Sequence, residues 1–114
     1  MPPSIVVVIR EDPRKTHRAV EALRIALGLG TGENPLTVVL LGQAPLLISD
    51  DTEDIVDGDI LEKYLPSFKQ LEISFTVLLG TGSRFTLDPE FKVVESSEEA
   101  IHSMVAAADR VLVF

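Results

Sequence analysis

Ser4-Ile-Val-Val-Val-Ile9 sets the fold class of this chain. Its apolar residues follow one another without the polar alternation of a half-exposed strand, which is typical of a strand buried on both faces. The segment Leu36–Leu41 repeats the pattern, and Gly42 ends it. Strands of this kind occur in parallel sheets that helices cover on both faces. The two segments therefore predict an α/β domain.

Helical patterns separate the expected strands. Asp12 and Pro13 have the residue types of an N-cap and a first helical position, so we expect a helix that starts there and is ended by Gly28 and Gly30. Short helices are expected at 44–48 and near 60–69, the second interrupted near Pro66. A capping box of Ser96 and Glu99 predicts a last helix that runs through residue 108. Segments 49–59 and 83–91 are expected to be loops.

Three further strands are expected at 72–79, 92–94 and 110–114. Five strands that alternate with helices at this length predict a three-layer α/β/α domain with a mainly parallel sheet. Its 114 residues fit a single domain, residues 1–114, of flavodoxin-like size.

Composition limits the possible partners. The formal net charge of −8 opposes binding to nucleic acid or to anionic membranes. No apolar run approaches the roughly 20 residues that span a bilayer, and the first residues lack the basic region of a signal peptide, so we expect a cytoplasmic protein. The chain has no cysteine, one asparagine and two glutamines, a usage expected of a thermophile.

Two segments are candidate ligand sites, because ligands of parallel sheets gather beyond the carboxyl ends of the strands. The first contains Arg10, Arg14 and Lys15, which would bind an anion; alternatively, Glu11 and Asp12 offset their charge. The second is Gly80-Thr81-Gly82-Ser83-Arg84, whose glycines would let backbone N–H groups approach a ligand. An ordinary tight connection explains this second segment equally well.

Metal and nucleophile chemistry have little support in the sequence. The acidic segment 50–59 lacks the ligand spacing of an EF-hand and is expected to be a solvated loop. His17 and His102 stand alone in their helices, and no Ser-His-Asp arrangement is indicated. We expect no metal and no cofactor.

Two segments carry a family resemblance. The first, 17–29, ends in Ala-Leu-Gly-Leu29, and the second, 36–44, ends in Gly42-Gln43-Ala44. Together they resemble the DsrE/DsrF-like family, which includes the TusB, TusC and TusD sulfur-relay subunits. The later pattern of short helix, third strand and C-terminal helix and strand is similar as well. The resemblance implies a small α/β/α domain that forms homo-oligomers or assembles with related subunits.

Active members of that family carry a persulfide on a cysteine just after the third strand. This chain has Gly80-Thr81-Gly82-Ser83 there, and serine cannot carry a persulfide. The resemblance therefore implies a noncatalytic partner or scaffold subunit, with oligomer contacts expected at an exposed apolar run, Pro45–Ile48, and at Phe85–Phe91. The alternative is a small-anion or nucleotide-binding domain that uses the two candidate segments.

Overall fold

Five parallel strands form one sheet in the computed structural model, which describes residues 3–30, 32, 35–50, 52 and 54–114. The sheet order is β4-β3-β2-β1-β5. The strands are β1 (Ile5–Ile9), β2 (Leu36–Leu40), β3 (Ser74–Leu78), β4 (Lys92–Ser96) and β5 (Arg110–Val113). The helices are α1 (Arg18–Gly30), α2 (Gly58–Gln70), α3 (Thr81–Arg84) and α4 (Glu98–Ala107), with a 3-10 helix, η1 (Ala44–Ile48).

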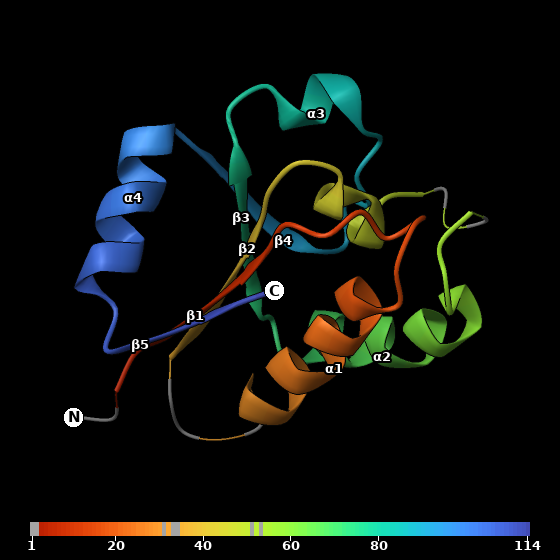
Figure 1. The fold of residues 1–114 in the computed structure, drawn as a ribbon, viewed down its shortest axis with the longest axis horizontal. Helices are drawn as coiled ribbons and strands as arrows, with labels where there is room; N and C mark the ends of the chain where they lie inside the picture. Colours follow the sequence, from red (N-terminus) through yellow and green to blue (C-terminus); the bar gives the residue numbers. More distant parts are fainter. Residues whose placement is uncertain (1–2, 31, 33–34, 51, 53) are drawn as a thin grey trace.

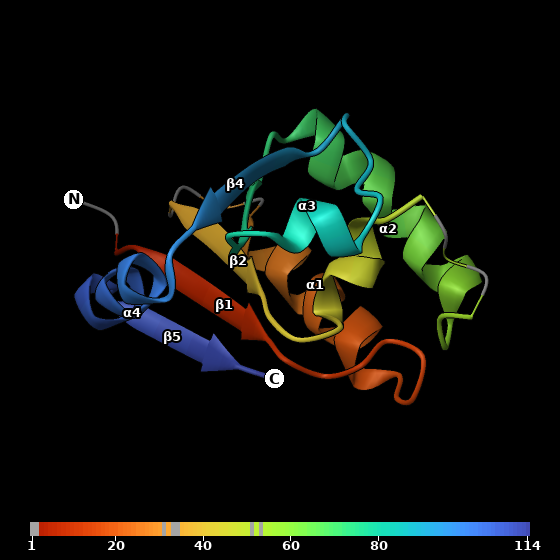
Figure 2. The same ribbon diagram turned by 90° about the horizontal axis from the view of Figure 1, so that it is seen from above.

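Helices cover both faces of the sheet, which confirms the predicted three-layer α/β/α class. Figure 1 shows α1 and α2 on one side of the sheet and α4 on the other. The connections from β1 to β3 move across the sheet in one direction, whereas α4 returns the chain to place β5 beside β1. Because crossovers are right-handed, this reversal puts α4 on the opposite face. Figure 2 shows α4 lying over β1 and β5.

The two faces of the sheet differ in how much apolar surface they bury. The face under α1 and α2 holds the larger cluster of buried residues, in which Phe75 packs against Phe68 and Phe91 with ring centroids 5.5 and 5.6 Å apart. On the other face the buried residues are Val6, Val8, Val39 and Ile101, with partly buried neighbours from α4. One helix therefore covers a face that spans five strands, and part of that face stays open.

The predicted start of the first helix is wrong. Asp12 instead closes a separate turn: its Oδ1 accepts from the backbone N–H of Arg14 at 2.9 Å, and its carbonyl accepts from Lys15 N–H at 3.0 Å. Helix α1 begins at Arg18, whose N–H donates to Thr16 Oγ1 at 3.2 Å. Pro13 is buried, so packing rather than capping accounts for its position.

The predicted interruption of the helix near Pro66 is also wrong. Helix α2 is continuous from Gly58 to Gln70 with Pro66 inside it. Proline removes one helical hydrogen bond. Leu61 and Phe68, on either side of Pro66, are both buried and fix the helix against the core, and their packing outweighs that loss.

Two loop or cap assignments change as well. Ser83 and Arg84, at the start of the segment expected to be loop, form the one-turn helix α3 together with Thr81 and Gly82. Strand β4 runs on to Ser96, so the N-cap of α4 is Ser97, whose Oγ accepts from Ala100 N–H at 3.1 Å. The predicted capping box was one residue out of register, because two adjacent serines offer the same local signal.

The predicted interface at Pro45–Ile48 is wrong, because this segment is not exposed. Pro45 is buried, and Leu47 and Ile48 have no exposed surface, since η1 packs into the core over the end of β2. Phe91, at the end of the second expected contact segment, is only 6% exposed. None of the described helices is long and apolar enough to cross a membrane.

Candidate functional site

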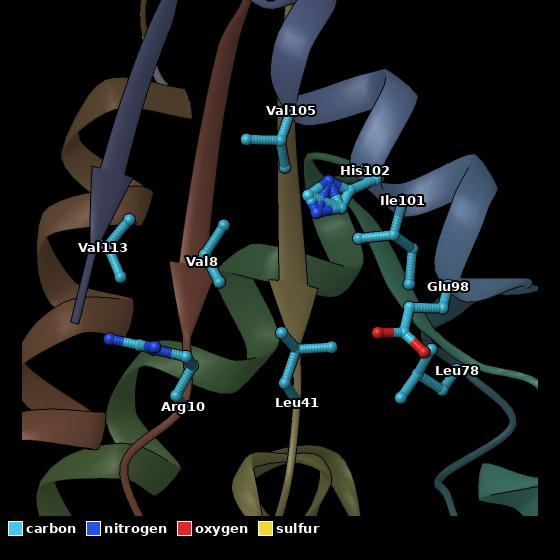
Figure 3. A pocket seen from close by; sticks show the side chains of 9 residues that line it. All are labelled: Val8, Arg10, Leu41, Leu78, Glu98, Ile101, His102, Val105 and Val113. Atoms are coloured by element: carbon cyan, nitrogen blue, oxygen red, sulfur yellow. The ribbon is translucent and has the colours of Figure 1, made fainter.

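The carboxyl ends of β1, β2, β3 and β5 share one edge of the sheet, and a cavity of about 590 Å³ opens there beneath α4. Apolar side chains make up most of its lining, which consists of Val8, Leu41, Leu78, Val113, Ile101 and Val105, together with Arg10, Glu98 and His102. Figure 3 shows the strand residues as the floor and the residues of α4 as the wall. We call this the α4 cavity.

The topology explains why the α4 cavity lies at this place. The connection that leaves β1 crosses one face of the sheet, and the connection that enters β5 crosses the other. In open α/β sheets, ligands bind outside the carboxyl ends of strands at such a point of reversal. Val8 at the end of β1 and Val113 at the end of β5 both line the cavity. A mostly apolar cavity with a few polar groups is the usual form of a small-molecule site.

Three polar side chains surround this apolar floor. Glu98 and His102 lie one turn apart on the same face of α4, and Arg10 follows the last residue of β1. Among the described residues, none of these three side chains forms an ion pair or a side-chain hydrogen bond. They are therefore available to a ligand.

The basic residues predicted to share one anion site lie apart. Arg10 lines the α4 cavity, whereas Arg14 lines a separate cavity of about 80 Å³. The Arg14 guanidinium contacts Asp12 at 3.1 Å and Gln43 at 3.5 Å. The hydrogen bond from the Arg14 side chain is the main cause that holds the pKa of Asp12 below its ordinary value. Lys15 is exposed to solvent.

Several hydrogen-bonding groups of the Gly80–Arg84 segment are already used in contacts within the chain. Gly82 N–H donates to Glu95 Oε1 at 3.0 Å, so a carboxylate of the chain already holds one of the expected anion-binding donors. Thr81 Oγ1 donates to the Leu78 carbonyl at 2.5 Å, and Ser83 N–H donates to the Gly80 carbonyl at 3.1 Å.

Arg84 lies at a different place from Arg10. Its guanidinium is 5.1 Å from the centre of the Phe85 ring, and it lines a separate cavity of about 320 Å³ with Asp50 and Thr86. The structure thus divides the eight predicted residues among at least three places.

Glu98 and His102 were missed as site residues. The sequence did contain a signal, because their spacing of four residues puts both side chains on one face of a helix that must pack on the sheet. Among the described residues, no group of three or more His, Asp or Glu side chains is placed to hold a metal ion. Asp51 and Glu53, part of the acidic segment expected to be a loop, lie outside the described residues.

The free edge of β5 is the second feature that a partner can recognise. All four residues of β5 are exposed, with Val111 at 36%, Leu112 at 37% and Val113 at 55%. Arg110 N–H donates to the Ser4 carbonyl and Phe114 N–H to the Val8 carbonyl. Because alternate residues of a strand point the same way, the N–H groups of Val111 and Val113 face away from β1.

The opposite edge of the sheet carries more charge than β5, whose one charged residue is Arg110 at its start. Strand β4 has Lys92 and Glu95 among its five residues, and charged side chains are a common protection of edge strands against pairing with another chain. The Val111–Val113 run has no charge and no proline. The two edges therefore differ in the way expected if β5 alone is to be paired.

Comparison with known structures identifies the fold. The chain is similar to the YchN protein from E. coli, whose crystal structure aligns with a TM-score of 0.78 over 100% of both chains. The fold is that of YchN. Sequence identity between the two is 20%, so the likeness concerns architecture. No protein-family model matches the chain, and no curated protein sequence matches it.

Proposed function

We propose that this chain is a noncatalytic DsrE/DsrF-like subunit that assembles with a second copy or a related subunit, as a partner or scaffold in sulfur relay. Two lines of evidence support the family part. The segments 17–29 and 36–44 resemble the family, and the five-stranded parallel fold shared with YchN is the architecture that the resemblance implies. The amino-acid usage supports a thermophilic source, and a cytoplasmic location is part of the proposal.

One observation carries the noncatalytic part. The segment directly after β3 is Leu79-Gly80-Thr81-Gly82-Ser83, and the whole chain has no cysteine. A persulfide carrier needs a sulfur that is both attacked and attacking, which a hydroxyl does not supply. Glu95 and Leu78 instead tie Gly82 and Thr81 into the one-turn helix α3. The segment therefore serves as a structural connection in this chain.

The free edge of β5 supports assembly. An unprotected edge strand is a template for another strand, and a two-fold axis beside it would pair β5 of one copy with β5 of another, antiparallel. The outward N–H groups of Val111 and Val113 would then find acceptors in the partner strand. The valine side chains, already more than a third exposed, would be buried in the same contact.

A persulfide-transfer assay combined with a mass measurement tests this function. The protein alone is expected to accept no sulfur from a persulfide donor, and light scattering after size exclusion should give at least twice the protomer mass of 12.4 kDa at micromolar concentration. Robust sulfur transfer would contradict the noncatalytic role. A mass of one protomer would contradict self-assembly.

The alternative function is small-anion or nucleotide binding, predicted from the basic residues and the Gly80–Arg84 segment, of which Arg10 is the residue that still supports it. The observation that favours it is Arg10, whose guanidinium has no carboxylate partner among the described residues of a chain with 18 acidic residues. Inorganic phosphate and ATP are the probes. Saturation at 100 times the dissociation constant should add about 2.7 kcal/mol of stability, and no shift in melting temperature would leave the assembly role alone.

A further inference from the structure

We propose that the α4 cavity binds an elongated organic zwitterion with an apolar body, whose carboxylate pairs with Arg10 and whose ammonium group pairs with Glu98. This inference does not require the assembly proposed above, although Val113 contributes to both the cavity and the β5 edge. It shares Arg10 with the anion-binding alternative but makes no use of the Gly80–Arg84 segment.

The floor of the cavity favours an extended apolar body. Its four floor residues lie on or directly after four neighbouring strands, β5, β1, β2 and β3, in that spatial order. Strands lie about 4.8 Å apart, so the floor extends about 14 Å across the sheet. Ile101 of α4 covers it and is 6% exposed, whereas Val113 at the β5 end is 55% exposed. The cavity is thus covered by α4 over one part and open toward β5.

The charges at the cavity are opposite in sign and separate from each other. Figure 3 shows the Arg10 side chain extending toward the β5 side, while the Glu98 carboxylate lies on the other side, near Leu78. No ion pair joins the two side chains. A molecule that crosses the floor therefore meets a cation toward one end and an anion toward the other.

Arg10 differs from the two neighbouring arginines in having no ion pair among the described residues. Arg14 pairs with Asp12, and Arg18 pairs with Glu11, the residue that follows Arg10. The nearest carboxylates along the chain are thus engaged elsewhere, and Arg10 keeps its charge free at the cavity.

The pair of charges selects against simple ions. A monoanion drawn to Arg10 is repelled by Glu98, and an amine drawn to Glu98 is repelled by Arg10. A zwitterion satisfies both side chains, and its apolar body covers Val8 and Leu41. His102, which lies near Val105 and Ile101 in Figure 3, adds a ring to the wall of the same cavity.

Four probes with the same apolar body test the proposal on the intact protein: 8-aminooctanoate, octanoate, octylamine and octanol. Methyl NMR titrations follow the signals of Val8, Leu41 and Ile101. The zwitterion is expected to bind about fivefold more tightly than octanoate and than octylamine, as two partly exposed charge pairs would give. Equal affinities for all four probes, or no change at these methyl groups, would overturn the proposal.

Two variants test which side chain pairs with each end of the zwitterion. Arg10→Gln should abolish the preference for 8-aminooctanoate over octylamine, and Glu98→Gln should abolish the preference over octanoate. Arg24→Gln is the matched control, because Arg24 lies on α1 at the other face of the sheet and should leave every affinity unchanged. Preferences that survive in both cavity variants would contradict the assignment.

Discussion

The Glu95 carboxylate, near the end of β4, accepts a hydrogen bond from the backbone N–H of Gly82 at 3.0 Å and so ties α3 to the edge of the sheet. Where the family resemblance implies a sulfur-carrying cysteine, this chain has a glycine-containing turn fixed by one of its own acidic side chains. The contact has a measurable consequence for stability.

Glu95→Ala should lower the free energy of unfolding by about 0.5–1.5 kcal/mol, the usual net worth of one hydrogen bond. Urea denaturation measures the loss, and hydrogen exchange should show a faster Gly82 amide. Glu62→Ala, an exposed substitution on α2, is the control and should have less effect. Equal losses in the two variants would show that the bond contributes nothing.

Gly80 should tolerate alanine poorly, although it has space for it. A Cβ atom there would meet nothing within 4 Å, but the backbone φ is +89°. Alanine in the left-handed region costs roughly 1–2 kcal/mol, so Gly80→Ala should lower stability by about that amount.

Gly28→Ala is the matched control for Gly80→Ala. Its Cβ would also meet nothing within 4 Å, but Gly28 lies inside α1 with ordinary helical φ. It should raise stability by roughly 0.5–1 kcal/mol, because alanine is the better helix former. Thermal and urea unfolding of both variants would give opposite signs; the same sign would contradict the backbone argument.

Leu47→Ala should reduce stability by about 2–5 kcal/mol, as expected for a fully buried leucine. Leu79→Ala removes the same atoms from a side chain that is 65% exposed and should change stability by less than about 0.5 kcal/mol. The comparison, measured by urea denaturation, checks that η1 belongs to the core. A small effect of Leu47→Ala would indicate that the segment lies at the surface instead of in the core.

Asp88 makes the free energy of unfolding depend on pH in the acidic range. Hydrogen bonds from the Glu90 backbone and then from the Lys69 side chain hold the pKa of Asp88 below its ordinary value. Such a group stabilises the fold above its unfolded pKa of about 3.9, and the contribution is lost as the pH falls through the lower folded pKa.

Asp88→Asn should therefore cost up to about 1 kcal/mol at pH 7 and should flatten the stability profile below about pH 4. Urea denaturation at pH 7, 5 and 3 measures both effects. Glu62→Gln, on an exposed position of α2, is the control for a change of charge alone. A variant profile parallel to that of the unmodified protein would contradict the assignment.

The buried strands could be predicted from the sequence because continuous apolar runs such as Ile5–Ile9 have one common explanation. The boundaries of helices and strands were harder to predict where two local sequence signals competed. Ser96 and Ser97 offer the same cap, and the length of β4 decides between them. Pro66 breaks isolated helices, but burial of Leu61 and Phe68 keeps α2 intact.

The α4 cavity could not be predicted, because it depends on which face α4 covers. Strand order places Val8 beside Val113, although 105 positions separate them in the sequence. Arg10 was recognisable from its position after β1, whereas Glu98 resembled an ordinary residue of a helix start. A site whose residues are brought together only by the tertiary fold is hard to recognise from any one segment of the sequence.

The mass of Val111→Pro in solution, compared with Val111→Thr, tests the proposed assembly most directly. The Val111 N–H faces the free edge of β5, so proline removes an outward donor and leaves the bonds of Arg110 and Phe114 to β1 in place. Light scattering should give one protomer for the proline variant and the assembled mass for the threonine variant, with matching circular dichroism. An assembled mass for both variants would contradict pairing through β5.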